Sequence, residues 1–293
     1  MRDDFATFIL THGRADTVVT HKALERCGYT GKLFFLIDNE DEQASAYVEK
    51  FGDRVIVFDK EEAARNCDSG INHGSRNGIL FARNACFEVA KSLGLKYFWQ
   101  LDDDYPSFHW ASDNDGNYLD ATSKSLIKNL DVVVDACVEF LAESGAKTVA
   151  FCQGGDFIGG EKGRFATLAR QGRFSRKAMN SFFCDVDNPI NFRGIMNEDV
   201  STYTESGRRG ELFITIPRLR LQQKATQSLA GGVTELYETF GTYAKAFLSV
   251  MYSPSCVKVS MMGDKHRRLH HHVQWKNAVP LVLSEKYRKP RSI

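Results

Sequence analysis

Several features that would define other classes of protein are missing from this sequence of 293 residues. Lysine and arginine number 38 against 37 aspartates and glutamates, so the formal charge of +1 excludes a uniformly basic surface of the histone kind. Proline is scarce, at six residues, and the chain is 43% hydrophobic and 26% charged, which excludes extensive disorder and collagen-like repeats. The composition is that of a folded globular protein.

Long apolar runs and paired cysteine motifs are also missing. No stretch approaches the roughly 20 apolar residues of a membrane-spanning helix, and the N-terminus has no secretory apolar core. The seven cysteines are scattered and never spaced as C-x-x-C, which indicates free thiols and no disulfide or zinc framework. We therefore expect a cytoplasmic protein without a membrane segment.

Strand and helix patterns alternate along the chain. Apolar, β-branched runs predict strands at residues 5–11, 32–37, 54–58, 97–101, 148–152 and 212–216. Amphipathic spacing predicts helices at residues 17–27, 42–51, 76–93, 125–144 and 234–252. Repeated β-α-β units indicate an α/β fold with a mainly parallel central sheet and helices on both faces.

Polar side chains follow three of the predicted parallel strands, at Thr11–Arg14, Asp38–Asp41 and Asp102–Asp104. Ligands bind at this edge of an open parallel sheet. Three adjacent aspartates repel one another unless a cation lies among them, and carboxylates suit Mg²⁺ or Mn²⁺. Strand alternation places Asp102 and Asp104 on one side, which predicts a metal and a nucleotide diphosphate there. A solvated acidic loop is the alternative.

Charged residues around that edge fit a nucleotide or nucleotide sugar. Asp38 is placed to contact the base or the ribose, and Arg14, Arg76 and Arg83 to contact phosphates. Each arginine taken alone is typical of a surface residue, and only the three together favour a nucleotide site.

Two later segments carry further candidates. Glu198 and Asp199 could supply a general base that takes the proton from an acceptor hydroxyl, or they could be the acidic first turn of a capped helix, and both can hold. The run His270, His271 and His272 lies between apolar residues, and one of the three is expected to contact a metal or a phosphate. A surface histidine run is the alternative.

Longer blocks carry a family resemblance. The segments THGRADTVVTHKALERCGYTGKLFFLIDNED, VIVFDK, ARNACFEVAKSLGLKYFWQLDDDY, VMYSPSCVKVSMMG and RLHHHVQW resemble the TET-associated glycosyltransferases of phages, within the family-2-like inverting GT-A enzymes. The resemblance implies a Rossmann-like GT-A fold in one domain over residues 1–293. Residues 1–104 would bind the nucleotide sugar, 105–257 the acceptor, and 258–293 would form a basic C-terminal extension on the site.

The resemblance also implies an activity and roles for individual residues. A sugar would move from a nucleotide sugar, expected to be a UDP sugar, to the hydroxyl of 5-hydroxymethylcytosine in DNA, with Mn²⁺ or Mg²⁺ as cofactor. The nucleotide sugar would meet Thr11, Arg14, Asp38, Arg83, Asp102 and Asp103. The metal would be held by Asp104, Asp102 and His271, and the catalytic pair would be Asp199 as base with Glu198 beside it.

Two basic stretches are candidates for contacts with DNA phosphates. Residues 162–177 carry six basic side chains and no acidic one, and residues 258–293 carry nine against two acidic ones. They are interleaved with aromatic residues that could stack a base: Phe165, Phe174, Trp275 and Tyr287. A solvated basic face is the alternative. Transfer to a non-DNA acceptor, nucleotidyl transfer and a non-catalytic nucleotide-sugar or DNA-binding module remain as rival functions.

Overall fold

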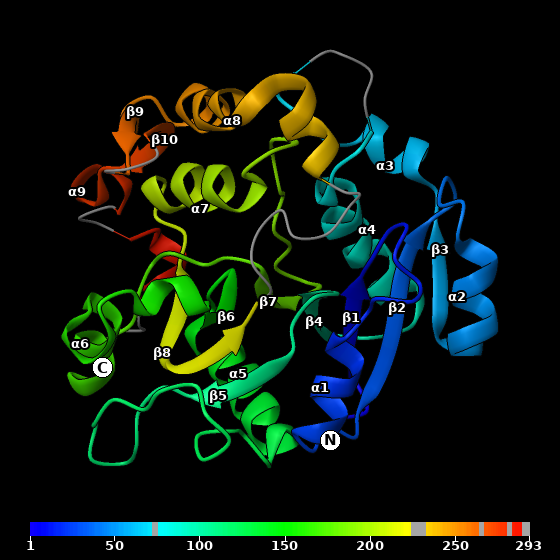
Figure 1. The fold of residues 1–293 in the computed structure, drawn as a ribbon, viewed down its shortest axis with the longest axis horizontal. Coiled ribbons are helices and arrows are strands. Elements are labelled where there is room, and N and C mark those ends of the chain that lie inside the picture. The colour runs from blue at the N-terminus through cyan, green and yellow to red at the C-terminus, as the bar shows by residue number, and fades with distance from the viewer. Residues whose placement is uncertain (72–75, 224–232, 264–266, 280–282, 289–293) are drawn as a thin grey trace.

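The computed structural model describes residues 1–71, 76–223, 233–263, 267–279 and 283–288. An eight-stranded sheet in the order β3-β2-β1-β4-β7-β6-β8-β5 forms its centre (Figure 1). Its strands are β1 (Phe5–Leu10), β2 (Lys32–Asp38), β3 (Val55–Phe58), β4 (Tyr97–Asp102), β5 (Ser107–Trp110), β6 (Thr148–Cys152), β7 (Ser181–Asp185) and β8 (Phe213–Gln222). A separate hairpin pairs β9 (Val257–Met262) with β10 (Arg268–Val273).

The α-helices are α1 (Thr20–Arg26), α2 (Ala44–Phe51), α3 (Lys60–Arg65), α4 (Ile79–Ser92), α5 (Leu130–Ser144), α6 (Arg164–Arg170), α7 (Glu198–Arg208), α8 (Val233–Tyr252) and α9 (Trp275–Ala278). None of the helices in the described ranges has the length and apolar character needed to cross a bilayer. All seven cysteines are free thiols, as the sequence predicts.

Parallel pairing dominates the sheet. Four pairs are parallel (β1–β2, β1–β4, β2–β3 and β6–β8) and three are antiparallel (β4–β7, β6–β7 and β5–β8). The expected α/β fold with a mainly parallel sheet is therefore confirmed. The antiparallel insertion of β7 between β4 and β6 was not expected, since its five residues show no periodic pattern.

Both faces of the sheet are covered by helices, as expected. Every residue of β1 is buried, and its side chains alternate between two cores. Phe5 and Ile9 pack with residues of α1, α2 and α5, whereas Phe8 packs with residues of α4 and α7. The near-continuous apolar runs of β1 and β2 follow from this two-sided burial.

Several element boundaries differ from the prediction. Helix α1 begins at Thr20, three residues later than expected, because the backbone N–H groups of Val19 and Thr20 bond the carbonyl oxygen of Asp103. Helix α5 begins at Leu130, because the residues before it pair with β5: Leu126 forms a bridge with His109, and the Ile127 backbone N–H bonds the carbonyl oxygen of Phe108. The bonds at α1 tie the loop after β1 to the end of β4.

The C-terminal elements lie together at the top of Figure 1, where α8 is next to α7 and to the β9–β10 hairpin. Helix α8 contains a break at Gly241, whose φ of 70° is not helical. The hairpin begins at Val257, next to the boundary expected at 257/258, and the three-part division of the domain stays a prediction. Residues 264–266, 280–282 and 289–293 of the basic tail lie outside the described residues.

Candidate active site

The end of β4 meets the loop after β1 in a chain of hydrogen bonds. Thr11 Oγ1 donates to Asp103 Oδ2 at 2.7 Å, and Arg14 Nη1 donates to Asp103 Oδ1 at 3.3 Å. Because the Thr11 proton is used in this way, the Tyr47 hydroxyl donates to Thr11 Oγ1 at 2.7 Å, and it accepts from the Arg14 backbone N–H at 2.8 Å. Three predicted nucleotide contacts, Thr11, Arg14 and Asp103, are thus brought together.

Asp38 ends β2 between a histidine and a lysine. Its carboxylate accepts from His12 Nδ1 at 2.7 Å and from Lys60 Nζ at 3.2 Å. Burial raises the pKa of Asp38, but the hydrogen bond from His12 and the charge of Lys60 outweigh burial and leave the pKa lowered. The same bond raises the pKa of His12. Sequence reasoning missed Lys60, which follows the next strand and is buried.

Arg83 joins two acidic segments that are far apart in the sequence. Its Nη2 donates to Asp102 Oδ1 at 3.0 Å and its Nε donates to Glu198 Oε1 at 2.9 Å. The guanidinium is 1% exposed and lies over the Phe182 ring, 5.0 Å from its centroid. Arg83 therefore couples the end of β4 to the start of α7, and its predicted contact with a diphosphate stays a prediction.

Asp199 is buried beside Glu198 in the first turn of α7. Burial and the charge of Glu198 raise the pKa of Asp199 to about 7. A general base is most effective when its pKa lies near the working pH, so this carboxylate has the proton affinity that the role requires. Glu198 is held by Arg83, which distinguishes the two members of the pair.

The start of α7 is not capped in the expected way. Asn197 occupies the cap position, but its φ is 56° and its side chain makes no capping bond to the helix. The Asn197 amide instead donates to the carbonyl oxygen of Lys245 on α8, at 3.0 Å. The acidic first turn of the alternative interpretation is present, and the tertiary contact has replaced the side-chain cap.

Lys245 was not among the predicted residues. Its charge lowers the pKa of Asp199 and of His271, which places its ammonium within electrostatic reach of both. Nothing in the sequence marks this lysine, since it lies in an amphipathic helix more than 40 positions from Asp199.

His271 lies on β10, where it meets the start of α7. Its Nδ1 is 3.0 Å from Asn197 Nδ2. Burial, with the nearby charges of His270 and Lys245, lowers the pKa of His271 to about 3, so the ring is neutral. His272 is exposed.

The carboxylates at the end of β4 fit a divalent cation. Asp104 Oδ1 is buried and has no hydrogen-bond partner in the described ranges, and burial with the charges of Asp102 and Asp103 raises the pKa of Asp104 to about 7. A bound cation would satisfy the orphaned oxygen and relieve the repulsion. No three His, Cys, Asp or Glu side chains of the described residues form a group that could hold a metal, so His271 is not assembled with Asp102 and Asp104.

The basic stretch at 162–177 forms α6 and the segment after it. Lys162, Arg164, Arg170 and Arg173 are exposed, whereas Lys177 is paired with Asp156 at 2.6 Å. Of the four aromatic residues expected to stack a base, Phe174 is the exposed one, at 49%. Phe165 is buried, Trp275 stacks on Tyr203, and Tyr287 donates to Glu211. These three have structural contacts that account for them, and the exposed Phe174 ring also packs against Phe140, with the ring centroids 5.2 Å apart.

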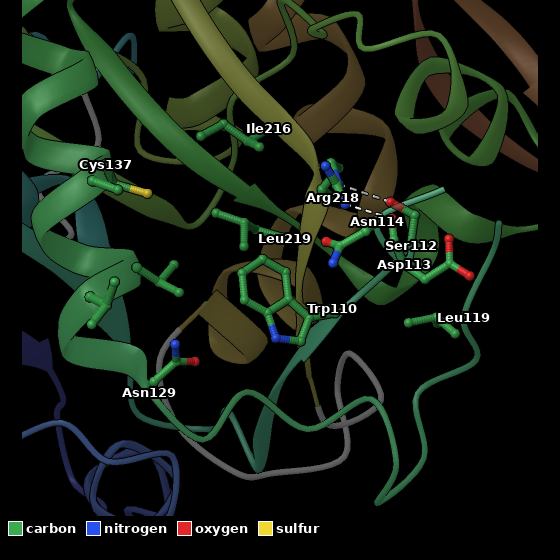
Figure 2. A pocket seen from close by; sticks show the side chains of 13 residues that line it. Trp110, Ser112, Asp113, Asn114, Leu119, Asn129, Cys137, Ile216, Arg218 and Leu219 are labelled. Atoms are coloured by element: carbon green, nitrogen blue, oxygen red, sulfur yellow. Dashed lines mark hydrogen bonds between the residues drawn. The ribbon is translucent and has the colours of Figure 1, made fainter. Parts of the chain in front are cut away.

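A cavity of about 540 Å³ opens between α5 and the strands β5 and β8 (Figure 2). Its wall includes Trp110, Asn129 and Leu219, and Arg218 donates across it to Ser112 Oγ at 3.2 Å. None of the predicted site residues lines this cavity. It is therefore separate from the acidic groups described above.

A comparison with protein families gives one match for most of the chain. The family model described as TET-Associated Glycosyltransferase matches residues 5–232. No curated protein matches the sequence. The match includes the acidic turn after β4, Arg83 and the start of α7, and it ends before α8.

Solved structures of glucosyl-3-phosphoglycerate synthase from Mycobacterium tuberculosis are similar at low identity. Its complex with Mg²⁺ and UDP is 11% identical, with a TM-score of 0.46 over 92% of this chain and 87% of that chain. Its complex with Mn²⁺ and UDP-glucose is 10% identical, with a TM-score of 0.45 over 92% and 86%. Likeness at this level says nothing about the ligands of the present chain.

Proposed function

Because the chain belongs to the TET-associated glycosyltransferase family, we propose that it transfers a sugar from a nucleotide sugar, expected to be a UDP sugar, to the hydroxyl of 5-hydroxymethylcytosine in DNA. The observation that carries the proposal is the ion-pair bridge through Arg83, which links Asp102 of the donor-side acidic turn to Glu198, next to the candidate base Asp199. Groups for leaving-group stabilisation and for proton removal are thus coupled in one network.

On the donor side, the residues around the ends of β1, β2 and β4 would bind the nucleotide sugar. Asp38, held ionised by His12 and Lys60, would accept hydrogen bonds from the base. Thr11, Arg14 and Asp103 would line the nucleotide, in the order set by their mutual hydrogen bonds. Rigid pairing of these side chains lowers the entropy cost of orienting the donor.

Asp104 and Asp102 would hold Mn²⁺ or Mg²⁺. The orphaned Asp104 Oδ1 supports this assignment, since hard carboxylate oxygens are the ligands that these ions prefer. When bound, the ion would neutralise the negative charge on the departing nucleoside diphosphate.

On the acceptor side, Asp199 would remove the proton from the hydroxymethyl group as its oxygen attacks the anomeric carbon. The new C–O bond forms as the bond from that carbon to the diphosphate oxygen breaks, so the configuration inverts. The proton ends on Asp199 and the bonding electrons leave with the nucleoside diphosphate. A pKa of about 7 lets Asp199 accept this proton and release it to water between turnovers.

The DNA would approach over α6. The exposed Lys162, Arg170 and Arg173 can contact phosphates without reading sequence, and the exposed Phe174 can stack a base. A base within a duplex is out of reach of Asp199, so a flipped base or a single strand is the expected substrate.

Mass spectrometry of nucleosides tests the proposal. The protein is incubated with DNA containing 5-hydroxymethylcytosine, Mn²⁺ and a panel of nucleotide sugars, and the DNA is then digested. A hexose or N-acetylhexosamine increment on the modified base is expected, absent with unmodified cytosine and absent with Asp199→Asn. Release of nucleoside diphosphate without an increment would refute the DNA acceptor, and pyrophosphate release would refute glycosyl transfer.

A further inference from the structure

Asn197 has a rare backbone conformation directly before the candidate base. Its φ of 56° lies in the left-handed region, which Asn180 is the only other non-glycine residue of the described ranges to adopt. Asparagine tolerates this region better than most residues, but side-chain contacts are still needed to hold a single conformation. The position matters because α7 begins with Glu198 and Asp199.

The side chain of Asn197 is held by residues far along the chain. Its Nδ2 lies 3.0 Å from the carbonyl oxygen of Lys245, 3.2 Å from Ser249 Oγ and 3.0 Å from His271 Nδ1. Two of these partners are on α8 and one is on β10, and all three follow the family-matched residues 5–232. The segment beyond the family match therefore contacts the residue that sets the start of α7.

These contacts determine which nitrogen of His271 carries the proton. A carbonyl oxygen only accepts, so the amide nitrogen of Asn197 must face Lys245, and the amide cannot be reversed. The amide nitrogen carries two hydrogens and only donates; the two nearer acceptors are the Lys245 carbonyl oxygen and His271 Nδ1, both at 3.0 Å, with Ser249 Oγ farther away at 3.2 Å, so His271 Nδ1 takes the second hydrogen. A nitrogen that accepts this bond carries no proton, so the proton of the ring is on Nε2.

We propose that His271 is a positioning residue, which holds Asn197 and thereby orients Asp199, and that it is not a metal ligand. The inference rests on the proposed role of Asp199. A metal-bound histidine needs a deprotonated nitrogen with a free lone pair. Here Nδ1 already accepts a hydrogen bond and Nε2 is protonated, so the donor set does not fit. This replaces the expectation that a late histidine completes the metal site.

The kinetic test uses substitutions that separate the two ring nitrogens. In His271→Asn the side-chain oxygen or nitrogen lies near the place of Nδ1, whereas in His271→Gln it lies near the place of Nε2. We expect His271→Leu to lower kcat by about 10- to 100-fold, as misplacement of a catalytic group does, with the donor KM unchanged. His271→Asn should restore most of kcat and His271→Gln little of it. His272→Leu, at an exposed position of the same strand, is the matched control.

Two further measurements do not depend on turnover. Calorimetry should give the same Mn²⁺ affinity for His271→Leu as for the wild type in the presence of UDP. In the ¹⁵N-labelled protein, the long-range proton–nitrogen spectrum of His271 should show an unprotonated Nδ1 and a protonated Nε2, unchanged by Mg²⁺. Thermal melting of each variant checks that the fold is intact.

The outcomes are distinguishable. A loss of Mn²⁺ affinity in His271→Leu, better rescue by Gln than by Asn, or deprotonation of Nε2 on addition of Mg²⁺ would each overturn the proposal in favour of metal ligation. Unchanged kcat in a folded His271→Leu would overturn the positioning role. A wild-type protein inactive with every donor would refute the proposed function instead. The spectrum of His271 would still show whether its Nδ1 accepts the hydrogen bond from Asn197.

Discussion

Replacement of Arg83 by methionine would test the most deeply buried ion-pair network of the site. Methionine has a similar length and is apolar, so it can keep the contacts with Phe182 and Phe192 while it removes the charge. Asp102 and Glu198 would then lose a shared partner that donates to them at 3.0 and 2.9 Å. Two carboxylates would be left close together without a cation.

The cost follows from burial. Breaking a buried ion pair by removal of one partner typically costs about 3–5 kcal/mol, because the remaining charge is uncompensated. In a chain of this size about 1 kcal/mol corresponds to roughly 2–4 °C in Tm, so Arg83→Met should melt roughly 6–20 °C below the wild type. Arg83→Lys keeps the positive charge but cannot bond both carboxylates as the planar guanidinium does. Its Tm should lie between those of Arg83→Met and the wild type.

The assay is thermal unfolding monitored by calorimetry, and a variant of a surface ion pair serves as the matched control. Arg65 bonds Glu61 on α3, and its side chain is 70% exposed, so Arg65→Met should leave Tm unchanged. A Tm for Arg83→Met equal to that of Arg65→Met would refute the reasoning. Addition of Glu198→Gln to Arg83→Met should recover part of the loss, since it removes one of the two unpaired charges.

The other predictions concern Asp199, Asp104 and the basic face of α6. Asp199→Asn should abolish transfer while calorimetry shows unchanged donor affinity. Because burial and Glu198 raise the pKa of Asp199 to about 7, and the base must be ionised, kcat/KM should fall as the pH drops below about 7. Asp104→Asn should weaken Mn²⁺ binding, and chelation should lower the wild-type Tm but not that of the variant. Arg170→Ala with Arg173→Ala should weaken DNA binding equally for all sequences and reduce its salt dependence.

The sequence was sufficient to locate the strands that are buried on both faces. Residues 33–37 are apolar without interruption, residues 97–101 are interrupted only by Gln100, and both runs lie within β2 and β4. Strand β7 was not predicted, since its sequence SFFCD shows no alternation and lies in a region without regular β-α-β spacing. Its place between β4 and β6 is a property of the assembled sheet.

The site shows the same division. Carboxylates such as Asp38 and Asp102 are recognisable because they end strands, and the edge of a parallel sheet gathers them. The sequence also offers Arg83, Glu198 and His271 as candidates, but it does not show which residues pair, since Arg83 and Glu198 are 115 positions apart and Asn197 and His271 are 74 apart. Asn197 even carries a misleading signal, because asparagine before two acidic residues is typical of a helix cap.

The packed structure continues past residue 232, where the family match ends. The hairpin and α9 share a small core of Cys256, Val257 and Ala278, and Trp275 stacks on Tyr203 of α7. Truncation before the hairpin would uncover these apolar side chains and remove His271 from Asn197 in one step, so loss of activity would have two causes. Point substitutions at His271 leave the core intact, and for that reason they are the experiment that separates positioning from folding.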